Sequence, residues 1–64
     1  MEVEARTADI SRGGVGLIHS QFIPPGTHLA VKFPAEGSEK VVHGVVRYCR
    51  HIGGIQHRIG VQFI

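Results

Sequence analysis

The sequence contains a single cysteine, no tryptophan and only four aromatic residues among 64 positions. One cysteine excludes an internal disulfide framework and any zinc site built from several cysteines. So few aromatic rings leave little material for the base-stacking surfaces of proteins that bind single-stranded nucleic acid. No apolar run approaches the roughly 20 residues that a membrane span needs, and no signal-peptide pattern is present. We therefore expect a small protein that works in the cytoplasm.

Charged residues make up 19% of the chain and hydrophobic residues 42%, a balance typical of a globular domain rather than a disordered one. The formal net charge is +2, and arginine supplies most of the basic side chains. A weak positive charge carried by arginine favours a modest anionic ligand over a long nucleic-acid backbone. A small basic β-barrel that binds RNA or DNA is kept as a less favoured hypothesis.

Glycine and proline residues divide the chain into five strand-like runs, and none of the runs has a helical pattern. Apolar and polar side chains alternate along them with a period of two, as in strands with one buried face. Short strands without crossover helices predict an all-β fold, a small antiparallel (split) β-barrel of about five to six strands. The runs cover residues 3–10, 15–22, 27–33, 40–52 and 55–64.

A Gly-Gly pair at positions 53 and 54 separates the last two runs and predicts a two-residue β-hairpin with a primed turn. With this turn Ile52 faces Ile55, and the ladder continues to Val46 opposite Val61. One face of the hairpin is then apolar and the other polar, the pattern of an antiparallel sheet that packs on one side. The predicted apolar face comprises Val46, Tyr48, Ile52, Ile55, Ile59, Val61 and Phe63, and the polar face Arg47, Cys49, His51, Gln56, Arg58 and Gln62.

Catalytic motifs are absent from the sequence, which has no nucleophile elbow, no helical pair of metal-binding histidines and no phosphate-binding Walker loop. We therefore predict no enzymatic activity, no catalytic residue and no metal site. The five histidines, at positions 19, 28, 43, 51 and 57, are spread over four of the runs, where surface or half-buried strand positions are the expected role. Cys49 lies between Arg47 and His51 on the predicted polar face, opposite Arg58, a setting that favours a reactive thiolate. An inert structural thiol is the interpretation that we prefer.

One segment, residues 9–16, carries a pattern suited to recognition of guanine. The carboxylate of Asp9 can accept two hydrogen bonds from the N–H groups of a guanine edge, and Ser11 adds a hydroxyl on the same side of an extended backbone. Gly13 and Gly14 allow positive φ and let a planar ring or a phosphate approach the backbone closely. The alternative is an ordinary polar turn in which Asp9 and Ser11 satisfy their own backbone.

The pattern Asp9-x-Ser11-x-x-Gly14 resembles the (D/N)xSxxG motif of the PilZ domain family, bacterial receptors of cyclic di-GMP. The resemblance implies a β-barrel of about six strands, commonly followed by a C-terminal helix, and a ligand often bound as an intercalated dimer. It also implies that Asp9 accepts from guanine, that Ser11 bonds to guanine or phosphate, and that Gly14 leaves room for the ring. Further candidates for ligand contact are Arg12, Gly13 and Arg47. Later segments that resemble the family in the same order are residues 14–17, 25–31, 44–47 and 58–64.

The second motif of the family, RxxxR, is missing, because the arginines stand at positions 6, 12, 47, 50 and 58 and no two are four apart. In the family this motif lies upstream of the aspartate, where it clamps phosphates and stacks on bases. Two arginines, each worth ~1.5–3 kcal/mol in charge-assisted hydrogen bonds, correspond to roughly two to four decades of affinity. We therefore expect residues 1–64 to form a single PilZ-like domain, truncated at the N-terminus and lacking the C-terminal helix.

The leading hypothesis is a non-enzymatic receptor or adaptor domain that binds cyclic di-GMP and relays its level to a partner in motility, biofilm or exopolysaccharide control. No cofactor is expected besides this ligand. The alternative is a PilZ-like protein-interaction module that binds no nucleotide, as in the type IV pilus branch of the family. Because a missing first strand would leave a sheet edge open to pairing with another chain, a homodimer is a further expectation.

Overall fold

The computed structural model describes residues 2–3, 6–35 and 38–64, which form six β-strands in one sheet and, within these ranges, no helix. The order across the sheet is β1-β4-β5-β6-β3-β2. β1 and β4 are parallel, and every other neighbouring pair is antiparallel. The all-β prediction is confirmed, although the first predicted run is divided between two strands at opposite edges. The strands are β1 (Glu2–Val3), β2 (Arg6–Ile10), β3 (Gly14–His19), β4 (His28–Ala35), β5 (Ser38–Gly53) and β6 (Gln56–Phe63).

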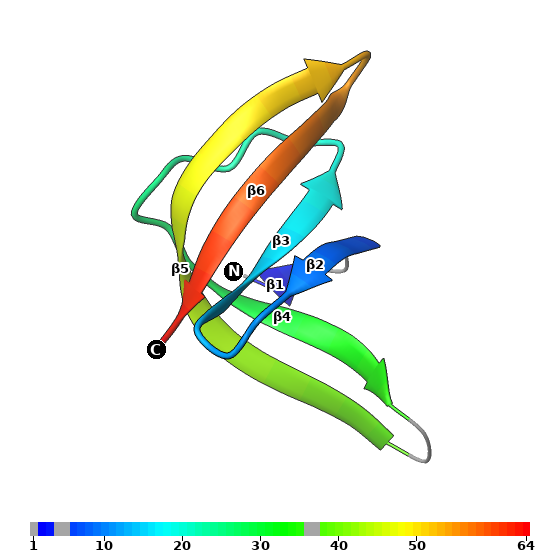
Figure 1. Ribbon diagram of the computed structural model, residues 1–64, viewed down its shortest axis with the longest axis vertical. Coiled ribbons are helices and arrows are strands. Elements are labelled where there is room, and N and C mark those ends of the chain that lie inside the picture. The colour runs from blue at the N-terminus through cyan, green and yellow to red at the C-terminus, as the bar shows by residue number, and fades with distance from the viewer. Residues whose placement is uncertain (1, 4–5, 36–37) are drawn as a thin grey trace.

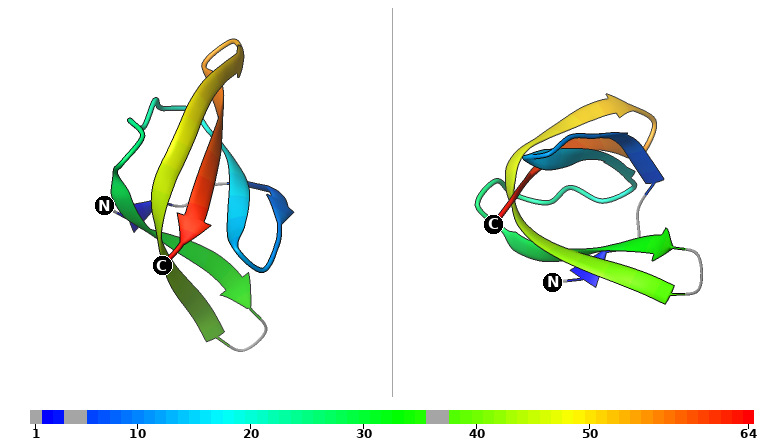
Figure 2. Two further views of the ribbon diagram at one scale, coloured as in Figure 1. Left: turned by 60° about the vertical axis from the view of Figure 1, so that its left-hand side comes forward. Right: turned by 60° about the horizontal axis from the view of Figure 1, so that its bottom comes forward.

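The sheet curls along β5, a strand of 16 residues that belongs to both halves of the domain (Figure 1). Its first part, residues 38–45, pairs with β4, and its second part, residues 44–53, pairs with β6. The curl brings β4 and the start of β5 to face β3 and β2 as two layers (Figure 2). The result is a barrel-like fold of the kind predicted from the sequence.

The core lies between these two layers and consists of aliphatic side chains from four strands and one loop. Leu17 in β3 and Ile59 in β6 are cross-strand partners, and both side chains are 0% exposed. Ile23, from the loop between β3 and β4, closes the core at 1% exposure. Because residues alternate along β3 and β6, the positions next to these core residues face outward. The core residues are Val15, Leu17, Ile23, Leu29, Val31, Val46, Ile59 and Val61.

The loop between β3 and β4 is held against β5 by backbone hydrogen bonds. The N–H of Gly26 donates to the carbonyl oxygen of Val46 at 2.7 Å, and the N–H of Val46 donates to the carbonyl oxygen of Thr27 at 2.9 Å. The hydroxyl of Thr27 donates to the carbonyl oxygen of Pro24 at 2.7 Å. Gly26 has a φ of +91°, which favours glycine at this turn. These contacts fix the loop so that its apolar residue reaches the core.

The hairpin between β5 and β6 is present, but its turn lies one residue later than predicted. The turn residues are Gly54 and Ile55, and only Gly54 has a positive φ, of +53°. Ile52 is an extra residue in β5 that shifts the pairing next to the turn. Ile52 and Ile55 were predicted on the apolar face, but their side chains are 51% and 69% exposed at the tip of the hairpin.

A second β-bulge in β5, at Arg47, restores the predicted register further along the hairpin. Val46 faces Val61 as predicted, whereas Tyr48 faces Gly60 and Cys49 faces Ile59. Two predictions are therefore wrong, because each bulge exchanges the faces of the residues that follow it. Tyr48 lies on the outer face, where it is 41% exposed. Cys49 is half-buried against the core, and its Sγ accepts a hydrogen bond of 3.5 Å from the backbone N–H of Ile23.

Candidate functional site

Two glycines lie side by side at the centre of the outer face, Gly16 in β3 and Gly60 in β6. Asp9 in β2 pairs with Gly16, and Tyr48 in β5 pairs with Gly60, so these residues form one row across four strands. A Cβ atom on Gly16 would lie 2.6 Å from Oδ1 of Asp9, and one on Gly60 would overlap the ring of Tyr48. The side chains of Asp9 and Tyr48 therefore lie directly over bare glycine backbone.

Asp9 and Tyr48 reach the outer face because each follows a β-bulge. In β2 the extra residue is Ala8. If Ala8 paired regularly with Gly16, Asp9 would pair with Val15, a core residue, and face inward. In β5 the extra residue is Arg47. If Arg47 paired regularly with Gly60, Tyr48 would also face inward, opposite Ile59. Bulges are known to re-aim side chains beside functional sites. Here two of them place a carboxylate and an aromatic ring on either side of the glycine pair.

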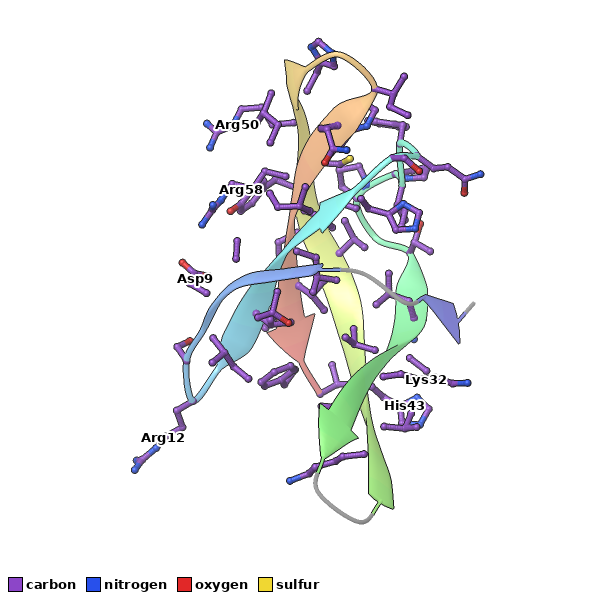
Figure 3. All side chains as sticks on the ribbon, turned by 90° about the vertical axis from the view of Figure 1, so that its right-hand side faces the viewer. Asp9, Arg12, Lys32, His43, Arg50 and Arg58 are labelled. Carbon is purple, nitrogen blue, oxygen red and sulfur yellow. The ribbon has the colours of Figure 1, made fainter. Side chains whose placement is uncertain are left out.

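An ion pair joins Asp9 to Arg58 across this row. Nη2 of Arg58 donates to Oδ2 of Asp9 at 3.1 Å, and the two side chains are 32% and 70% exposed, respectively. A side-chain hydrogen bond to Tyr48 and the negative charge of Asp9 raise the pKa of Arg58 above its usual value. Cζ of Arg50 lies 5.6 Å from the centroid of the Tyr48 ring, in a cation–π contact. Asp9, Arg58 and Arg50 all lie along the same side of the sheet (Figure 3).

The turn between β2 and β3 carries the remainder of the predicted motif. The backbone N–H of Ser11 donates to the carbonyl oxygen of Gly14 at 2.9 Å, and its hydroxyl donates to the same oxygen at 3.3 Å. The carbonyl oxygen of Gly13 accepts from the N–H of Phe63 at 2.9 Å, which ties the turn to β6. Neither Gly13 nor Gly14 has a positive φ. The side chain of Ser11 thus forms its hydrogen bond within its own turn, as the alternative interpretation predicts. The side chain of Asp9 instead accepts a hydrogen bond from Arg58.

Glycine is needed at position 14 because the backbone of β6 lies against it. A Cβ atom there would overlap the carbonyl oxygen of Val61, which is backbone and cannot rotate away. We expect Gly14→Ala to lower the free energy of unfolding by about 1–3 kcal/mol, the usual cost of overpacking. Gly13→Ala is the matched control, because a Cβ there meets nothing within 4 Å and its effect is expected within about 0.5 kcal/mol. Equal stabilities of the two variants in urea unfolding would contradict this assignment.

An open depression of about 340 Å³ lies on the outer face beside this turn. Of the predicted ligand residues, only Arg12 is not part of its lining, since its side chain projects from the turn into solvent (Figure 3). At the opposite rim, Nε of Arg47 donates to Oε1 of Gln62. The role of these residues in binding stays a prediction, but the fold brings five of the six to one place. The five are Asp9, Ser11, Gly13, Gly14 and Arg47.

Sequence reasoning missed four residues of this face, namely Gly16, Gly60, Tyr48 and Arg58. A usable signal existed for the two glycines, because glycine inside a strand pattern marks a bulge or a close approach of other groups. Tyr48 was assigned to the apolar face, and Arg58 was placed opposite Cys49 instead of beside Asp9. The alternation of apolar and polar residues along one strand cannot predict the contact between Asp9 in β2 and Arg58 in β6, which lie on either side of β3.

Three histidines become neighbours in the sheet, although they stand on separate runs of the sequence. His19, His57 and His51 are successive partners across β3, β6 and β5, and the rings of His51 and His57 lie 5.5 Å apart. Nδ1 of His19 accepts from the N–H of Gln21 at 3.1 Å, and Nε2 of His51 donates to the carbonyl oxygen of Gly54 at 2.7 Å. In the part of the chain that the structure describes, no group of three or more side chains is arranged to hold a metal ion.

A curled sheet with an open depression beside a polar turn defines a small all-β domain. The chain belongs to the PilZ domain family, since the family model matches residues 2–64. The resemblance drawn from the motif is therefore confirmed over the whole chain. PilZ domains are generally non-enzymatic receptor domains. A search of curated proteins and one of solved structures each found no match to the chain.

The structure also bears on membrane association in one respect. Within the described ranges, no helix is long and apolar enough to cross a membrane.

Proposed function

We propose that this PilZ domain is a receptor for cyclic di-GMP that acts without catalysis in the cytoplasm and relays ligand binding to a protein partner in motility, biofilm or exopolysaccharide control. The observation that carries the proposal is the arrangement of the motif residues. Asp9, Ser11 and Gly14 line one open depression, and the carboxylate of Asp9 is 70% exposed above it. The membership of the chain in the PilZ family supports the same ligand.

The carboxylate of Asp9 can accept hydrogen bonds from a guanine edge while it is paired with Arg58. A carboxylate offers about four lone-pair sites, and Arg58 uses one at Oδ2. Oδ1 lies over the backbone of Gly16, which has no side chain to block an approaching ring. Arg58 thus acts as a positioning residue, because it fixes the direction in which the carboxylate accepts. Guanine can donate its two edge N–H groups to this fixed acceptor.

The test is a calorimetric titration of the folded chain with cyclic di-GMP. Asp9→Ala is expected to weaken binding by about 30- to 1,000-fold, corresponding to the loss of about 2–4 kcal/mol in charge-assisted hydrogen bonds. Ser11→Ala is expected to weaken it by about 2- to 10-fold, as befits one neutral hydrogen bond. His28→Ala, on the exposed side of β4 away from the depression, serves as the control and should bind like the natural chain.

Absence of heat at high micromolar ligand, with the chain folded by circular dichroism, would overturn the receptor proposal. The second candidate, an adaptor that works by protein contact alone, would then stand. It is supported by an apolar surface at the tip of the β5–β6 hairpin, where Ile52, Ile55 and Phe22 are 51%, 69% and 59% exposed. The ring of Phe22 packs edge-on against His57, 6.1 Å away, so this loop residue lies beside the hairpin.

A further inference from the structure

Tyr48 occupies a position on the outer face that the PilZ motif does not account for. Its ring lies over Gly60 and is 41% exposed, between two depressions. The first is the depression beside the motif turn, and the second, of about 480 Å³, is lined by Tyr48, Cys49 and Arg50. The ring rests on the backbone of Gly60 and carries the guanidinium of Arg50 above it, so a second planar group can stack on the ring when Arg50 moves aside.

Two arginines flank this ring and face each other directly. Arg50 and Arg58 are cross-strand partners in β5 and β6, and like charges in such a pair are mutually destabilising. Arg50 lies over the Tyr48 ring, and Arg58 forms an ion pair with Asp9. An anion placed between the two guanidinium groups would relieve their repulsion. The pair is thus suited to a phosphate group, which arginine binds in a bidentate manner.

The charges of this face match those of the proposed ligand. Arg47, Arg50 and Arg58 bring three positive charges, and Asp9 brings one negative charge. These four side chains therefore carry two net positive charges, and cyclic di-GMP carries two negative charges on its phosphodiester groups.

We propose that Tyr48, Arg50 and Arg58 form the second half of the nucleotide site, in which Tyr48 stacks on a base and the two arginines bind a phosphate. This inference rests on the proposed function and assigns to β5 and β6 the contacts with one base and one phosphate of the ligand. Asp9 and the turn then read the guanine edge, while the β5–β6 side binds the remainder of the same ligand.

The experiment uses the fact that Tyr48 is the sole tyrosine of the chain. Tyrosine labelled with ¹³C in the ring gives NMR signals from this one side chain, and stacking of a base moves its ring protons upfield. In calorimetry, Tyr48→Ala should weaken binding of cyclic di-GMP by about 5- to 150-fold, whereas Tyr48→Phe, which retains the ring, should stay within about 3-fold. Arg50→Gln should weaken binding and reduce its dependence on salt concentration, because one phosphate contact is lost.

The outcomes separate this inference from the proposed function. If the natural chain binds and Asp9→Ala loses affinity, but Tyr48→Ala and Arg50→Gln bind normally and the ring signals do not move, the second half of the site does not exist. If Tyr48→Ala loses affinity while Asp9→Ala does not, the β5–β6 side holds the ligand and the role assigned to the motif is wrong. If the natural chain gives neither heat nor ring shifts, both proposals fail. Thermal unfolding of each variant establishes that it is folded.

Discussion

Replacing Leu17 by alanine is expected to lower the free energy of unfolding by about 2–5 kcal/mol, the usual cost of removing a large aliphatic side chain from a core. The side chain is 0% exposed and faces Ile59, which is also fully buried, so the cavity has few neighbours able to fill it. A chain of this length has a total stability of about 3–10 kcal/mol. Leu17→Ala therefore removes a large part of the stability, and it unfolds the domain where the loss is as large as the total.

Urea unfolding followed by circular dichroism measures this loss, with Ile52→Ala as the matched control. Ile52 is also aliphatic and lies in the same sheet, but its side chain is 51% exposed at the hairpin tip. Its replacement is expected to change stability by no more than about 0.5 kcal/mol. A decrease of less than 1 kcal/mol for Leu17→Ala, or equal losses for the two variants, would show that the two layers do not pack around Leu17.

The strands could be predicted from the sequence because glycine and proline mark their ends and side chains alternate along them. The pairing of Val46 with Val61 was also predicted correctly, since both lie on the apolar side of a hairpin with a glycine turn. The pairing in the remainder of the hairpin was predicted wrongly, because the order of apolar and polar residues does not indicate the bulges at Arg47 and Ile52. Each bulge adds one residue to β5, and one residue is enough to exchange the two faces.

The candidate site could likewise be predicted only in part from the sequence. The turn after β2 could be predicted, because an aspartate, a serine and two glycines occur at close spacing in a single segment. The opposite side could not, since Tyr48 and Arg58 come from strands that are distant from Asp9 in the sequence. Their position beside it depends on sheet order and on a bulge in each of two strands. Only the fold reveals that the row of Asp9, Gly16, Gly60 and Tyr48 exists.

The two central glycines connect the fold to the proposed binding. Side chains at these positions would not disturb the core, because Gly16 and Gly60 point away from it, but would displace Asp9 and Tyr48. A substitution at either glycine is therefore expected to change ligand binding without a matching loss of stability. Such a substitution tests the geometry of the site in a folded domain. A substitution in the core, by contrast, is expected to lower the stability of the domain.

Gly16→Ala is expected to weaken binding of cyclic di-GMP by about 30-fold or more while the chain stays folded. The new Cβ would lie 2.6 Å from Oδ1 of Asp9 and 3.3 Å from Nη2 of Arg58, so both side chains must move from their present positions. These neighbours are side-chain atoms that can rotate, and alanine within a strand is favoured over glycine by about 0.5–1 kcal/mol. The free energy of unfolding is therefore expected to change by no more than about 1 kcal/mol, whereas the carboxylate no longer points at the ligand.

A double-mutant cycle with Asp9→Ala decides whether Gly16→Ala acts through that carboxylate. If it does, the double variant should bind no more weakly than Asp9→Ala alone, because the group that the methyl displaces is already absent. If the two losses add instead, the methyl group at position 16 obstructs the ligand directly, and Gly16 is itself a contact on the floor of the site. Binding of Gly16→Ala at the natural affinity would contradict both interpretations, since each requires the ligand to lie against the Asp9 side of the glycine row. Calorimetric titration of the four proteins under one buffer measures the coupling free energy, and urea unfolding of each confirms that the comparison concerns binding alone.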